Sequence, residues 1–265
     1  MKKFFSFLLI FFLSASFAIA RDENLGMRGP LNFLQSIILE KIISVRIKNF
    51  VGGKNSVNIE SYGAKALRNG IFKSAEFVGK DLNVDGIHIT SVRAKTLTEN
   101  NRIDISDKKK LKLLTDIQAE YKAELANSDL KTLLMSDEYT KRVNKINSKM
   151  APFARLYDTD IYCENNRLYF KLALLSDLIF GGKIFINCST DIYSNGYKTE
   201  LRDVRFSKRL KMDISDSLIR FVNDLNPINI VIKELDSAKI NVSADTINIV
   251  NDKIEISGII NIYKD

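Results

Sequence analysis

Short runs of alternating apolar and polar residues, separated by turn residues, fill the second half of this chain and constrain its fold most. Around Ile161–Cys163 and Ile184–Cys188 every second residue is apolar, which is the period of a β-strand with one buried face. Glu164–Arg167 and Asn195–Gly196 interrupt the alternation, and such residues are typical of hairpin turns. The sequence therefore predicts antiparallel hairpins here.

The same period of two occurs nearer both ends of the chain. Its apolar pairs are Val57 and Ile59, Leu82 and Val84, Ile87 and Ile89, Ile240 and Val242, Ile247 and Ile249, and Ile254 and Ile256. Breaks rich in Gly and Asn separate the earlier pairs, and Asn251-Asp252 is a turn signal in the tail. We expect strands in both regions.

Helical spacing of apolar residues appears in fewer places. It predicts an amphipathic helix over 31–45, which is apolar over most of its circumference, and another over 215–225, which ends before Pro227. Ser128-Asp129 and Ser136-Asp137 are start signals for two shorter helices. Residues 107–126 fit a helix or a strand equally well. Since strands and helices do not alternate regularly, the predicted class is α+β with antiparallel sheet.

The N-terminus has the pattern of a secretory signal peptide. Lys2 and Lys3 precede an apolar run from Phe4 to Leu13, and Ala18-Ile19-Ala20 is a small-residue cleavage pattern. The alternative is an uncleaved anchor, but the run is shorter than the roughly 20 residues that span a bilayer. We expect residues 1–20 to be removed, the remaining 21–265 to form one domain, and the protein to work in the periplasm or elsewhere in the cell envelope.

Charge and cysteine content narrow the possible partners. The formal net charge of +8 favours anionic surfaces, and for an exported protein the nearest is anionic lipid. Export, the absence of Trp and the lack of a recognisable motif argue against nucleic acid. Cys163 and Cys188 both lie in apolar alternation, so they fit two separate buried thiols or a disulfide. We predict pairing, because neighbouring hairpins carry them and the compartment is oxidising.

The sequence contains few candidate residues for catalysis or metal binding. His88 is the only histidine, and between two apolar strand residues it is expected to face solvent. Asp158 and Asp160 could contribute to a Ca²⁺ site, yet such sites draw on more oxygen ligands, so a solvated pair is preferred. No phosphate loop, nucleophile elbow or zinc cluster occurs in the sequence. The sequence predicts neither an enzyme nor a bound cofactor.

Three further segments leave alternatives open. Two basic clusters, 108–112 and 208–211, are either solvated faces or contacts to phosphate head groups at a membrane. The apolar run 172–180 is either core or a lip that touches acyl chains, and core is preferred.

Four segments resemble the LmeA-like phospholipid-binding family, whose exported envelope proteins are similar to the tubular lipid-binding (TULIP) superfamily. These segments are the predicted helix 31–45, Asp85-Gly86-Ile87-His88-Ile89, residues 127–134 (NSDLKTLL), and the tail from Ile240 to Gly258. They resemble a fold signature and contain no catalytic fingerprint. The Lys-rich stretch 107–113 is similar to an insertion.

The resemblance implies a strongly curved antiparallel sheet wrapped around long amphipathic helices, with an apolar groove that shelters lipid acyl chains. A widely apolar helix needs apolar neighbours on several sides, which makes this arrangement plausible on physical grounds. The expected lipid-binding residues are Leu34, Ile37, Ile38, Ile42, Leu218, Phe221, Val222 and Leu225.

The function expected from these features is non-enzymatic binding or transfer of a phospholipid or other acyl lipid in the bacterial envelope. Each buried CH₂ contributes about 0.8 kcal/mol to such binding, so little specific chemistry is needed. The alternative is a structural or adaptor protein that binds another envelope protein and has no lipid ligand. In that case both predicted amphipathic helices are simply core. The sequence names no protein partner.

Overall fold

The computed structural model describes residues 52–84, 87–104, 112–151, 153–176, 182–196, 198–207, 212–229, 232 and 239–264. The signal segment and the predicted helix 31–45, with Leu34, Ile37, Ile38 and Ile42, lie outside these residues. Both basic clusters lie almost entirely outside them as well.

Antiparallel strands make up most of the described chain, and they form two larger sheets and a small one. The seven-stranded sheet contains β1 (Lys54–Glu60), β3 (Ser74–Val84), β4 (Ile87–Thr96), β7 (Ile117–Leu125), β14 (Lys253–Ile262) and β12 (Ile240–Val242) in that order, while β13 (Thr246–Val250) pairs with β14. The four-stranded sheet has the order β11 (Thr199–Phe206), β10 (Gly182–Ser194), β9 (Arg167–Ser176) and β8 (Ala154–Glu164). The small sheet joins β2 (Ile71–Phe72), β5 (Asn101–Asp104) and β6 (Lys112–Leu113).

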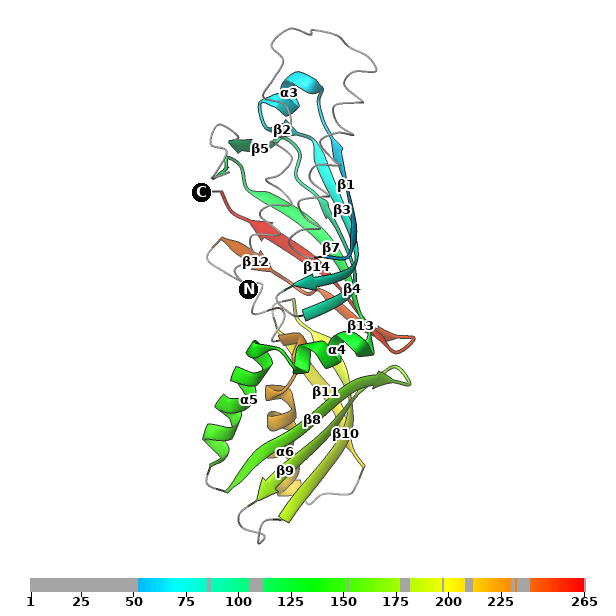
Figure 1. Cartoon of the computed structure of the whole chain (residues 1–265), viewed down its shortest axis with the longest axis vertical. Helices are drawn as coiled ribbons and strands as arrows, with labels where there is room; N and C mark the ends of the chain where they lie inside the picture. Colours follow the sequence, from blue (N-terminus) through cyan, green and yellow to red (C-terminus); the bar gives the residue numbers. More distant parts are fainter. Residues whose placement is uncertain are drawn as a thin grey trace.

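Figure 1 shows the two larger sheets stacked along the long axis of the molecule, with α4 (Asn127–Leu134) between them. Helices α5 (Asp137–Met150) and α6 (Met212–Asp224) lie beside the four-stranded sheet, α5 next to β8 and α6 next to β11. The short α3 (Ala64–Arg68) packs on β2. A bridge between Gly196 and Ala244 links the end of β10 to the strand connection of the other sheet.

Local sequence signals explain most of these elements. Asn165 and Asn166 adopt positive φ in the β8–β9 turn, as do Asn251 and Asp252 in the β13–β14 turn, and Asn and Asp tolerate this conformation better than most residues. Ser136 caps α5 by accepting a hydrogen bond from the Tyr139 amide. The predicted hairpins, closing strands and shorter helices are therefore confirmed.

Two of the open alternatives are resolved. Ile117–Leu125 forms strand β7, so within the described part of 107–126 the strand reading is correct. Leu172 and Leu174 are buried on β9, so the described part of the run 172–180 belongs to the core. The α+β class is confirmed, but the longest described helix, α5, has 14 residues, so the long helices implied by the resemblance are not among the described elements.

Asparagine side chains cover both edges of the four-stranded sheet. On β8, Asn127 bonds the N–H and C=O of Cys163 at 2.6 and 3.0 Å, and Asn147 does the same for Leu156 at 2.6 and 3.2 Å. On β11, Asn223 bonds both groups of Leu201, and Asn229 bonds both groups of Thr199. Each amide supplies the donor and acceptor that a neighbouring strand would supply, which protects edges that could otherwise pair with other chains.

Candidate functional site

One face of the seven-stranded sheet carries three cross-strand rows of mostly apolar residues. The register gives the rows as Val57, Phe77, Ala94, Tyr121 and Gly258; Ile59, Ala75, Thr96, Ala119, Ile260 and Val242; and Gly79, Val92, Ala123, Ile256 and Ile247. Alternation along each strand places these residues on one side. We call this surface the apolar sheet face.

Small residues occupy the middle of the apolar sheet face. Gly79, Ala94, Ala119, Ala123 and Gly258 lie on its central strands, whereas Ile and Val dominate its outer strands. Val92, Tyr121 and Ala123 are only half-buried, although most of the surrounding row residues are buried. The central part of the face therefore combines apolar chemistry with partial solvent access. Such a surface can bind an apolar ligand or an apolar surface of another molecule.

The described helices touch this sheet mainly near one end. Helix α4 packs against β4 and β7, and α3 packs on β2 outside the seven strands. Burial raises the pKa of Tyr121, and the charge of Asp245 raises it further. The Tyr121 phenol is therefore neutral at physiological pH, which keeps the apolar sheet face free of charge at this point.

A second cluster lies where α4 meets β4. The Nδ1 atom of His88 donates a hydrogen bond to Oδ1 of Asp129. The other carboxylate oxygen, Oδ2, accepts from the amide of Thr90 at 2.8 Å, the hydroxyl of Thr90 at 2.7 Å and the amide of Ala126 at 2.9 Å. The Thr132 hydroxyl accepts from the His88 amide at 3.1 Å. The predicted solvent-facing role of His88 is thus wrong in part, because its side chain is 31% exposed and joined to a carboxylate that is 1% exposed.

Asp129 is ionised in this cluster. Burial acts to raise its pKa, but hydrogen bonds from His88, Ala126 and Thr90 outweigh that effect and hold the pKa below its ordinary value. Two segments singled out in the sequence, around His88 and at 127–134, are therefore brought into contact. An aspartate that orients a histidine is also part of catalytic triads. The hydroxyls near this pair contact the Asp129 carboxylate or the His88 amide, and no described side chain bonds the other ring nitrogen of His88, where a triad nucleophile would lie. The cluster is explained by holding α4 on the sheet.

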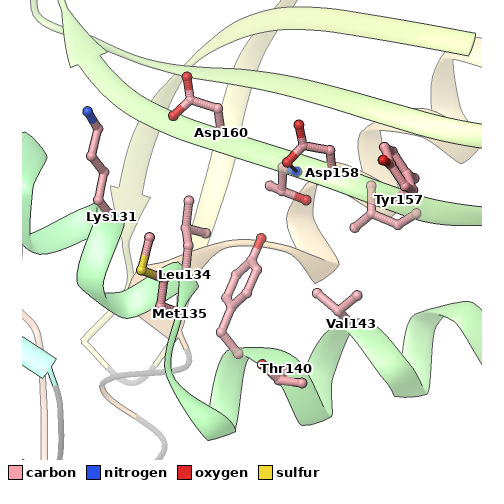
Figure 2. Close-up of a pocket in the computed structure, with 11 residues that line it drawn as sticks. Lys131, Leu134, Met135, Thr140, Val143, Tyr157, Asp158 and Asp160 are labelled. Atoms are coloured by element: carbon pink, nitrogen blue, oxygen red, sulfur yellow. Dashed lines mark hydrogen bonds between the residues drawn. The ribbon is translucent and has the colours of Figure 1, made fainter.

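A pocket of about 510 Å³ lies between α4, α5 and β8. Figure 2 shows Lys131, Leu134 and Met135 on the α4 side, Thr140 and Val143 on α5, and Tyr157, Asp158 and Asp160 along β8. Leu156, Thr159 and Tyr139 complete the lining. The Asp158 and Asp160 side chains point away from α5 in this view, so the pocket extends around the edge of the strand.

The Tyr139 hydroxyl forms no hydrogen bond of normal geometry, although the Thr159 side chain lies close to it. The residue is 3% exposed, and its hydroxyl oxygen is buried without a hydrogen bond. Burial raises the pKa of Tyr139, an effect that the nearby Thr159 side chain opposes. Leaving a buried hydroxyl unpaired costs on the order of 1–3 kcal/mol, so a ligand that pairs with it would recover part of this free energy.

The structure places the other predicted residues in the four-stranded half. On α6, Val222 and Leu225 are fully buried, whereas Leu218 and Phe221 are half-buried and pack against the same core. This helix lies beside β11 and not on the apolar sheet face. In the described residues, no three His, Cys, Asp or Glu side chains come together as a metal site, and Asp158 and Asp160 line the pocket instead.

Cys163 and Cys188 are both free, buried thiols. Cys163 is on β8 and Cys188 is on β10, and β9 lies between them. Two inter-strand spacings amount to about 10 Å, beyond the Cα separation of ~7 Å that a disulfide allows. The predicted bridge is therefore not formed. Sequence alternation gave their common buried face correctly, but it could not give the intervening strand.

Comparisons with known proteins identify no similar protein. No family model matches this chain, and no curated protein or solved structure matches it either. Among the described helices, none is both long and apolar enough to cross a membrane.

Proposed function

We propose that this protein binds the acyl chains of a phospholipid or similar lipid on the apolar sheet face, without catalysing a reaction, in the cell envelope. The observation that carries the proposal is the half-buried centre formed by Val92, Tyr121 and Ala123 within wide rows of buried apolar residues. The signal-peptide pattern and the resemblance to lipid-binding envelope proteins support it from the sequence.

The shape and the solvation of the apolar sheet face both favour contact with an acyl chain. Ala123 has a short side chain and is half-buried together with Val92 and Tyr121, and an acyl chain can cover such apolar surface without directional bonds. Each CH₂ removed from water contributes about 0.8 kcal/mol, so burying most of an acyl chain can offset the entropy lost on binding. The neutral phenol of Tyr121 adds an aromatic wall that tolerates the same contact.

Two variants of strand β7 test the proposal. Ala123→Phe enlarges a half-buried residue on the apolar sheet face, whereas Glu120→Phe places the same side chain on the opposite, exposed face of that strand. Both proteins are purified under conditions that retain ligands, and the bound lipid per protein is measured along with the melting temperature. We expect Ala123→Phe to lose most of its lipid and Glu120→Phe to keep it.

Equal lipid retention by both variants would contradict binding on this face. If Ala123→Phe mainly lowers the melting temperature while the folded fraction keeps its lipid, then the face is packed core. That result would favour the structural or adaptor alternative.

A further inference from the structure

The exposed part of the β8 edge lies between two segments whose backbone groups are covered by asparagine side chains. β8 pairs only with β9 among the described strands, and Asn127 and Asn147 cover Cys163 and Leu156 near its two ends. Alternate residues of an antiparallel edge strand direct their N–H and C=O groups away from the sheet. Because Cys163 does so, Thr159, four residues earlier, presents its backbone to the same side. That is the stretch of β8 that lines the pocket.

The Thr159 backbone is poorly satisfied there. Its N–H is held only by the carboxylate of the adjacent Asp158 at 2.8 Å, a local bond that a neighbouring strand can replace. Since sheet edges with open backbone groups accept extended peptides, the β8 edge between the two asparagines is a ready position for an added strand.

The two sides of the pocket differ in chemistry. The inner side, towards the helices, offers Leu134, Val143 and the buried, unpaired hydroxyl of Tyr139. The outer side offers Asp158 and Asp160, for which no ion pair occurs among the described residues. The lining therefore has two carboxylates against the single ammonium of Lys131, and an added strand would find apolar contacts on one face and negative charge on the other.

We propose that the β8 edge binds an extended peptide segment of a partner protein, in which apolar residues alternate with Lys or Arg. The peptide adds to the four-stranded sheet as a fifth strand between Asn147 and Asn127. Its apolar side chains lie against Leu134 and Val143, and its basic side chains pair across the strands with Asp158 and Asp160. A polar group of the peptide pairs with the Tyr139 hydroxyl. This binding is separate from lipid binding on the apolar sheet face, and either can fail without the other.

The first test is isothermal titration calorimetry of the full mature protein with the peptide acetyl-Val-Lys-Val-Lys-Val-amide. Two control peptides are acetyl-Val-Glu-Val-Glu-Val-amide, which reverses the charge, and the lysine peptide N-methylated at every residue, which keeps the side chains but loses its backbone donors. We expect binding of the lysine peptide and at least about tenfold weaker binding of each control, because an added strand needs both main-chain bonds and charge complementarity.

Protein variants locate the site. The double variant Asp158→Asn, Asp160→Asn should bind the lysine peptide about fivefold more weakly, while Glu120→Gln, on the other sheet, should bind it as the wild type does. Tyr139→Phe removes an unpaired hydroxyl, so it should fold with unchanged or greater stability and yet bind the peptide more weakly.

The proposal is overturned if the lysine peptide gives no binding at millimolar concentration or binds equally well when N-methylated. It is also overturned if the double Asn variant and Tyr139→Phe both bind the peptide like the wild type. In the last case the peptide binds elsewhere on the protein.

Discussion

The imidazole of His88 on β4 donates a hydrogen bond to the carboxylate of Asp129 in the first turn of α4. The two residues are 41 positions apart in the sequence, and their contact fixes α4 on the seven-stranded sheet. The same helix contacts β8 and so leads into the four-stranded sheet. Asp129 is therefore placed to hold the two halves of the molecule in their relative positions.

Replacing Asp129 with Ala should destabilise the protein strongly. The change leaves the amides of Thr90 and Ala126 and the His88 ring without their acceptor, and each buried donor left unpaired costs about 1–3 kcal/mol. We expect a loss of about 3 kcal/mol or more in the free energy of unfolding, measured by urea denaturation. Ser128→Ala, whose hydroxyl makes only a 3.3 Å contact to the same carboxylate, is the control and should cost less than 1 kcal/mol.

The same carboxylate should make stability depend on pH in the acid range. The pKa of Asp129 is lower in the folded protein than in the unfolded chain, where it is about 3.9. Its contribution is therefore complete above that unfolded value and is lost as the pH falls through the folded pKa. Between pH 5 and pH 2, the free energy of unfolding of the wild type should fall more than that of Asp129→Asn. Parallel curves would show that Asp129 does not have the lowered pKa.

Gly258 should not tolerate a side chain. A Cβ atom there would lie 2.0 Å from the carbonyl oxygen of Ser243, and backbone at this point cannot yield because Ser243 and Asp245 both bond the flanking residues of β14. Gly258→Ala should lower the free energy of unfolding by at least about 1–3 kcal/mol. Ser257→Ala, at the neighbouring half-buried position, loses only a hydroxyl bond to Thr246 and serves as the control. A Gly258→Ala protein as stable as this control would contradict the close approach of the two chain segments.

The edge asparagines should contribute to folding although neither charge nor apolar burial is involved. Asn229→Ala removes both side-chain bonds to the Thr199 backbone, at 2.8 and 2.6 Å, and should cost about 1–3 kcal/mol. Asn58→Ala, at an exposed position of β1, should be close to neutral. Thermal unfolding monitored by circular dichroism compares the two. Equal melting temperatures would mean that the β11 edge does not need its asparagine.

Both cysteines should be unreactive in the folded protein. Burial raises the pKa of each thiol to about 12, and for Cys163 the charge of Asp252 adds to this effect. Almost no thiolate is then present near neutral pH, and the thiolate is the reactive form. We expect a thiol reagent at pH 8 to modify neither residue until denaturant is added and then to modify both. Loss of titratable thiols in unfolded, unreduced protein would instead indicate the disulfide that the structure lacks.

Local chemistry made most of the strands and helices predictable, but not the contacts between them. Asn195-Gly196 and Asn251-Asp252 mark turns because few residues accept those backbone angles, and Ser136 marks a helix start because its side chain caps the first turn. Strand alternation showed which side of β4 carries His88, yet it could not show that α4 covers this side. The pocket beside β8 could not be predicted from the sequence either, because three elements line it and their arrangement depends on tertiary packing.

Lipid content of the protein itself tests the central claim most directly. The protein is purified from its own host without detergent and measured by native mass spectrometry, first intact and then after denaturation. The proposed function predicts a mass excess equal to one or more acyl lipids that disappears on denaturation and is strongly reduced in Ala123→Phe but not in Glu120→Phe. A wild-type mass equal to that of the bare chain under these conditions, with no lipid recovered by solvent extraction, would contradict lipid binding.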